Sequence, residues 1–124
     1  MPATSDDLNA RVTDAILRAE RAAPDSDEAA FLYRQVSELE EQISEITTPE
    51  TVEGGVARVG AVTAALDADD WVRASRLAEA YLVGAPADLE EELRDLLAEV
   101  DLVARKVAEP DVRPVEANLE ALAA

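Results

Sequence analysis

The sequence contains no cysteine and no histidine. Without cysteine there is no disulfide, no thiolate nucleophile and no thiolate metal site. Without histidine the chain lacks the commonest general base and the commonest ligand of transition metals. Ser/His/Asp and Cys/His catalysis and the histidine-containing di-metal sites of helical bundles are therefore excluded. We predict a protein that is not an enzyme and that uses no cofactor or metal.

Aromatic residues make up only 3% of the chain, although 48% of its residues are hydrophobic. Alanine, leucine and valine supply most of that fraction, and alanine and leucine are strong helix formers. A core of small aliphatic side chains reaches normal packing density only when helices lie close together. The 124 residues are the usual size of one domain, so we expect residues 1–124 to form a single helical domain.

Basic residues are also few, with 11 against 28 acidic residues, for a formal net charge of −17. A negative field of this strength repels phosphate backbones and anionic lipid surfaces, so we expect no direct nucleic-acid or membrane binding. Three explanations of the acidity remain. It keeps the protein soluble in a cation-rich cytoplasm, as in a salt-loving organism, it attracts a basic partner, or it mimics nucleic acid. All basic residues except Lys106 are arginine, which fits the first explanation and a GC-rich genome.

Long apolar runs are absent too. The sequence has no uninterrupted stretch of about 18 apolar residues that would span a membrane. Its first residues, MPATSDDLNA, have neither the basic segment nor the apolar segment of a signal peptide. A cytoplasmic location is therefore predicted.

Apolar residues recur at spacings of three and four, which is typical of amphipathic helices. The apolar runs of three predicted helices span residues 8–22, 29–46 and 89–107, and the other predicted helices cover about 49–66, 69–83 and, as a short last helix, Pro114–Leu122. The expected N-terminal caps are Thr4 or Ser5, Asp25 with Glu28, Thr48 before Pro49, the acids before Trp71, and Asp88. Short connections favour antiparallel neighbours. The fold class predicted is all-α, an antiparallel helical bundle or helical-hairpin stack of five to six helices.

The predicted helix at 49–66 has two different apolar faces. One carries Val52, Val56, Val59, Thr63 and Leu66, and the other carries Gly54, Ala57, Ala61, Ala64 and Ala68. Glycines cost a helix about 1 kcal/mol each relative to alanine, so the small face indicates that another helix lies very close to it. The alternative is that Gly54-Gly55 breaks the helix, which would then begin near Val56.

Clusters of acids along the chain are predicted to cap helices or to face solvent. Asp67-Ala68-Asp69-Asp70 fails as a calcium-binding EF-hand loop, because the sixth and twelfth positions hold Val72 and Ala78. These acids are expected to cap the next helix. Glu38, Glu40, Glu41 and Glu45 lie off the apolar stripe of residues 29–46 and are expected on its solvated face. The acids of residues 90–99 are interpreted in the same way, in preference to a weak cation site.

The stretch from about Gly55 to Asp88 resembles a tetratricopeptide repeat, a helical hairpin of about 34 residues. The resemblance rests on Asp69-Asp70-Trp71 at the turn, on Ala74 in the second helix and on Pro86 after it, whereas Ala78 and Tyr81 occupy the next pattern positions with their sizes exchanged. The first helix departs from the pattern, with Val62 at the family's small position and Ala65 at its tyrosine position. The resemblance implies a peptide- or protein-binding groove rather than catalysis.

We therefore predict a non-enzymatic protein-interaction module, an adaptor or regulator that binds another protein or itself. Its partner surface should be apolar with an acidic rim, and the small face of residues 49–66 and the leucines of residues 89–107 are candidates. The candidate contact residues are Trp71, Tyr81, Leu97 and Leu102. For Trp71 and Tyr81, packing in the core is the favoured explanation and a role as interface anchors is the alternative. The alternative is an acidic neutralising protein, such as an immunity protein, an antitoxin or a nucleic-acid mimic. No small-molecule ligand is expected.

Overall fold

The computed structural model describes residues 3–108, in which the regular secondary structure consists of helices, without strands. Its five helices are α1 (Ser5–Arg21), α2 (Asp27–Glu45), α3 (Val52–Asp67), α4 (Trp71–Leu82) and α5 (Ala87–Ala108). The predicted all-α fold is confirmed. The sixth predicted helix, Pro114–Leu122, lies outside the described residues. No helix within residues 3–108 has both the length and the apolar character needed to cross a membrane.

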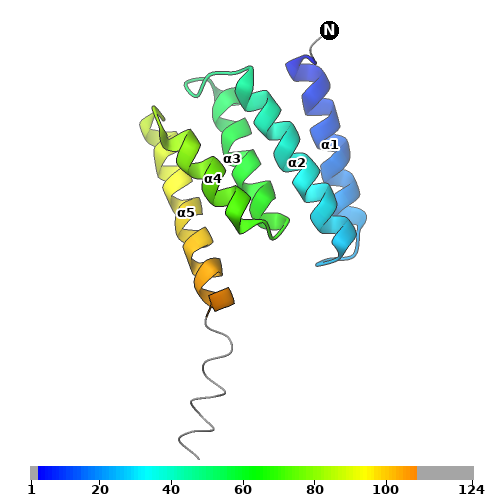
Figure 1. The fold of residues 1–124 in the computed structure, drawn as a ribbon. Helices are drawn as coiled ribbons and strands as arrows, with labels where there is room; N and C mark the ends of the chain where they lie inside the picture. The colour runs from blue at the N-terminus through cyan, green and yellow to red at the C-terminus, as the bar shows by residue number, and fades with distance from the viewer. Residues whose placement is uncertain (1–2, 109–124) are drawn as a thin grey trace, which may run out of the picture.

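The helices form a stack in which each packs antiparallel against the next one along the chain, as Figure 1 shows from α1 to α5. Alternate helices also meet. The backbone of α3 contacts that of α5, and Asn9 of α1 donates to Glu53 of α3. On the other side of the stack, Arg73 of α4 donates to Glu41 of α2. The odd-numbered helices therefore form one layer and the even-numbered helices the other.

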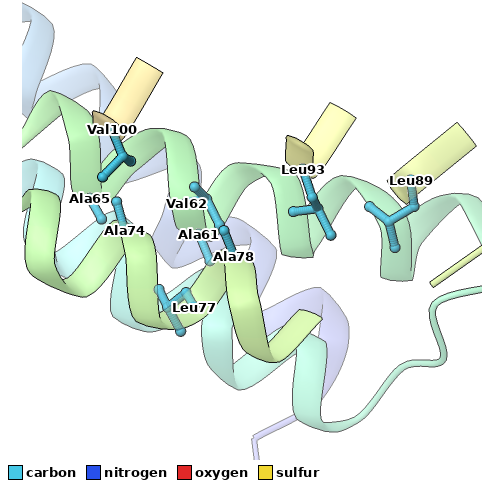
Figure 2. Close-up of a cluster of buried hydrophobic side chains, with 9 residues drawn as sticks. All are labelled: Ala61, Val62, Ala65, Ala74, Leu77, Ala78, Leu89, Leu93 and Val100. Atoms are coloured by element: carbon cyan, nitrogen blue, oxygen red, sulfur yellow. The ribbon is translucent and has the colours of Figure 1, made fainter. Parts of the chain in front are cut away.

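Helix α3 takes part in both hydrophobic cores found within residues 3–108. The first core joins α1, α2 and α3 through the buried residues Leu8, Val12, Ala15, Val36, Leu39, Ile43, Ala57 and Ala64. The second joins α3, α4 and α5, and in Figure 2 the side chains of Leu89, Leu93 and Val100 project from α5 toward the alanine-rich faces of α3 and α4. Because so many of these residues are alanine, the helices approach closely, as the composition predicted.

Two helix starts follow the sequence predictions. Thr4 caps α1 in a capping box with Asp7, since each side chain accepts from the other residue's backbone N–H. Asp70 caps α4 by accepting from the N–H of Arg73 at 3.1 Å. At the end of α4, Gly84 adopts a left-handed φ of 72°, which glycine permits at no steric cost.

Three other predicted starts are wrong by one to three residues. Asp25 does not cap α2, because it turns the chain with a φ of 60° and leaves Ser26 to accept from the N–H of Ala29. Thr48 does not cap α3; Thr51 does, by accepting from the N–H of Gly54 at 2.9 Å. Helix α5 begins at Ala87, so Asp88 lies within its first turn. The predicted continuity of α3 through Gly54-Gly55 is confirmed.

Candidate functional site

The four contact residues predicted from the sequence do not come together at one place. Trp71 and Tyr81 are half-buried near the two ends of α4, about 15 Å apart along the helix axis. Leu97 is half-buried on α5, and like the two aromatic residues it packs against the second core. Leu102 is 58% exposed and lies farther along α5. These residues therefore do not form a single surface patch.

Tyr81 holds a structural position between three helices. Its hydroxyl lies 3.0 Å from the Ser44 hydroxyl of α2 in a hydrogen bond, and the Arg58 guanidinium of α3 lies 5.7 Å from the centroid of its ring. Burial raises the pKa of Tyr81, although the bond to Ser44 acts in the opposite direction. This environment fits a residue that fixes α4 against α2 and α3.

Arg58 and Arg73 tie the end and the middle of α2 to the helices beside it. Arg58 donates to the carbonyl oxygens of Ser44 at 3.0 Å, Thr47 at 3.1 Å and its own helix's Gly54 at 2.9 Å. It thus brings a positive charge to the C-terminus of α2, whose last turn has no basic residue. Arg73 donates to Glu41 at 2.6 Å and to the buried Ser37 at 2.9 Å. These contacts give both arginines a role in holding the helices together.

The small face of α3 is buried against α2 and cannot serve as the partner surface that the sequence suggested. Gly54, Ala57, Ala61 and Ala64 are all buried. A Cβ at position 54 would lie 1.8 Å from the carbonyl oxygen of Thr48, so only glycine fits there. Farther along the same face, Ser37 of α2 donates to the carbonyl oxygen of Ala61 at 2.7 Å, so a neighbouring helix does lie close, as predicted.

The other apolar face of α3 remains exposed in part, because Val59 and Leu66 pack against the second core whereas Val52 and Val56 do not. Val52 is 85% exposed and Val56 is 62% exposed, and Gly55 lies between them. Exposed helix positions elsewhere in residues 3–108 mostly carry charges, whereas Val52 and Val56 carry none. Because valine and glycine are weaker helix formers than alanine, glutamate or lysine, helix stability does not explain their presence here.

This face of α3 forms a groove with the start of α5 and the loop before α3, here called the valine groove. Its volume is about 570 Å³. The floor and walls are formed by Pro49, Thr51, Val52, Gly55, Val56, Val59, Gly60, Thr63, Pro86 and Leu89. Three carboxylates complete the lining, those of Glu50, Asp88 and Glu92. The sequence predicted an apolar surface with an acidic rim, and the valine groove has that character at residues that were not selected as contacts.

Two glycines shape the groove in different ways. A Cβ at position 55 would meet no atom within 4 Å, so packing within the chain does not require this glycine. A Cβ at position 60 would lie 3.0 Å from the carboxyl carbon of Glu40. Gly55 therefore leaves open space in the groove, and Gly60 leaves room for the Glu40 carboxylate.

Glu40 is buried, which contradicts the prediction that it lies on the solvated face of α2. It is only 9% exposed. Helix α2 is covered by α1, α3 and α4, so its buried arc is wider than the apolar stripe and includes Ser37, Glu40 and Ser44. Burial raises the pKa of Glu40 to about 7. The only sequence signal for this environment was the glycine at position 60 of the facing helix.

The acids at the turn between α3 and α4 show no arrangement suited to a metal. Asp69 has a left-handed φ of 59°, and Asp70 caps α4. Asp67 has a raised pKa, because it is partly buried and because Glu99 and Asp69 lie nearby with the same charge. Within residues 3–108, no three acidic side chains gather closely enough to hold a metal ion.

Comparison of this chain with protein-family models, with curated proteins and with solved structures finds no match. The valine groove is therefore interpreted from its own residues alone.

Proposed function

We propose that this protein is a non-enzymatic interaction module whose valine groove binds an apolar segment of a basic partner protein. The observation that carries the proposal is the exposed Val52-Gly55-Val56 surface on a helix whose opposite face is already buried. Contiguous apolar surface with a polar rim is typical of sites where proteins bind one another.

The composition of α3 supports this proposal. Gly55 could be alanine without any clash, and that change would favour the helix by about 1 kcal/mol. Val52 and Val56 likewise make little contact within the chain, since most of their surface is exposed. Partner binding would explain why Val52, Gly55 and Val56 are present although they do not stabilise the isolated chain.

Charge supports the choice of partner. Glu50, Asp88 and Glu92 line the groove together with its apolar residues, and the whole chain carries a net charge of −17. Complementary charge steers a basic partner to the groove and discriminates against acidic ones. The resemblance of residues 55–88 to a tetratricopeptide repeat agrees, because it too implies a peptide-binding groove.

The proposal is tested with a phage-displayed library of random 12-residue peptides selected on the immobilised full chain. We expect peptides that combine apolar and basic residues, and we expect Val56→Asp to weaken their binding at least tenfold. The matched control is Val72→Asp, because Val72 is 60% exposed on α4 and lies outside the groove. If no peptide is enriched over the Val56→Asp chain, or if both variants bind alike, the proposal is wrong.

A second candidate is an acidic neutralising protein that binds a basic surface through charge alone. Within residues 3–108, ion pairs engage only the carboxylates of Asp14, Glu38, Glu41, Asp70 and Glu90. Most acids are thus free to face a partner. Such binding would weaken steeply with salt and would be insensitive to Val56→Asp. Binding in the groove would also weaken with salt, but it would be lost in the Val56→Asp variant.

A further inference from the structure

Glu40 is an acidic side chain that the fold buries without a counter-charge. It is about nine-tenths buried, yet none of the hydrogen bonds or ion pairs found among residues 3–108 involves its carboxylate. Its neighbour Glu41, by contrast, is paired with Arg73 at 2.6 Å. Charged side chains are rarely this deeply buried unless they are paired, so the missing counter-charge of Glu40 requires an explanation.

The carboxylate of Glu40 lies directly beside the valine groove. Its carboxyl carbon and Oε2 lie 3.0 and 3.1 Å from the point where a Cβ of residue 60 would be. Gly60 itself lines the groove, and it has no side chain to separate the groove from the carboxylate. Glu40 is not itself among the residues that line the groove, so its carboxylate is adjacent to the groove across Gly60.

The carboxylate oxygens of Glu40 also retain some exposure to solvent. In the part of the chain that the structure describes, no buried side-chain oxygen or nitrogen is both sealed from solvent and without a hydrogen-bond partner. Since the Glu40 oxygens make no hydrogen bond, each retains some contact with the outside. Burial raises the pKa of this group to about 7.

We propose that Glu40 receives a lysine or arginine side chain of the segment bound in the valine groove, which reaches the carboxylate through the gap at Gly60. This inference rests on the proposed function and specifies its ligand, an apolar segment with one basic residue at a fixed position. A cation at this point would supply the missing partner. The low local polarity would make the pair strong and selective, because a neutral side chain would leave the carboxylate unpaired.

The test starts from peptides that the groove selects from the 12-residue library. Each basic residue of a selected peptide is replaced by a neutral analogue, citrulline for arginine or norleucine for lysine. Binding of both peptides is then measured for the wild type, Glu40→Gln and the control Glu45→Gln. Glu45 is exposed on the same helix, so this control changes the net charge equally. A double-mutant cycle isolates the interaction between the two groups.

We expect one basic position to recur and its neutral replacement to weaken binding to the wild type at least about tenfold. For Glu40→Gln the same replacement should have little effect, whereas Glu45→Gln should behave as the wild type. If peptides are selected but have no recurring basic residue, or if the cycle shows no coupling, this inference is overturned while the groove proposal stands. If the groove selects no peptide, both are overturned.

Discussion

The guanidinium of Arg58 lies over the ring of Tyr81, 5.7 Å from its centroid, at the point where α2, α3 and α4 meet. The same guanidinium donates to carbonyl oxygens at the end of α2, and the Tyr81 hydroxyl is bonded to Ser44 of that helix. One side chain thus combines hydrogen bonding, charge at a helix terminus and cation–π attraction.

Replacing Arg58 by lysine should destabilise the fold by about 1–2 kcal/mol, because an ammonium group cannot reproduce the planar fork of donors. Urea unfolding followed by circular dichroism measures the change. The control is Arg76→Lys, since Arg76 is exposed on α4 and should tolerate the exchange within about 0.5 kcal/mol. Equal stabilities of the two variants would show that the contacts of Arg58 contribute nothing.

The adjacent glycines of α3 should respond to alanine in opposite directions. Gly54→Ala would bring a Cβ into the Thr48 carbonyl and should destabilise the protein by about 1–3 kcal/mol or more. Gly55→Ala meets no atom and should stabilise it by up to about 1 kcal/mol. Thermal melts of the two variants against the wild type measure both effects. A stabilised Gly54→Ala chain would contradict the close contact between α3 and the loop before it.

Glu40 should make the protein less stable as the pH rises. Its pKa is about 7 in the folded state against an ordinary value of 4.5, so the folded state binds more protons between these limits. The free energy of unfolding should therefore fall between pH 4.5 and 7, by up to about 3 kcal/mol from this group. Glu40→Gln should flatten that fall and should be more stable than the wild type at pH 8.

Urea unfolding at several pH values measures this effect as the difference between the two stability curves. Other carboxylates contribute to the slope of both curves and cancel in the difference. Glu45→Gln serves as the control, and its curve should run parallel to that of the wild type. If the Glu40→Gln curve is parallel as well, the carboxylate of Glu40 is solvated in the folded protein.

The melting temperature should rise with salt, because a net charge of −17 repels itself and salt screens that repulsion. We expect most of the rise within the first few tenths molar of NaCl, where the screening length falls below about 8 Å. A melt series from low salt to 2 M NaCl measures it. A steep rise that continues through the molar range would instead indicate adaptation to a salt-rich cytoplasm, and no change would contradict both explanations.

The sequence was a good guide to the helices and a poor guide to their exposed faces. Apolar spacing located all five described helices because each buries one stripe against a neighbour. It could not show which apolar face of α3 is covered, since the valine stripe and the glycine-alanine stripe are both apolar. Nor could it show that Glu40 is buried, because that depends on three helices covering α2. The valine groove was missed for the same reason: it consists of residues from α3 and α5 that only the fold brings together.

The way the helices stack has a consequence for how quickly the chain reaches its native state. In the described residues, no helix touches another that is more than two places away along the sequence. The mean sequence separation of contacting residues, the contact order, is therefore small. Helical proteins of low contact order fold within microseconds to milliseconds, because little loop entropy is lost before the contacts form. This chain should fold on that timescale, from whichever neighbouring pair of helices meets first.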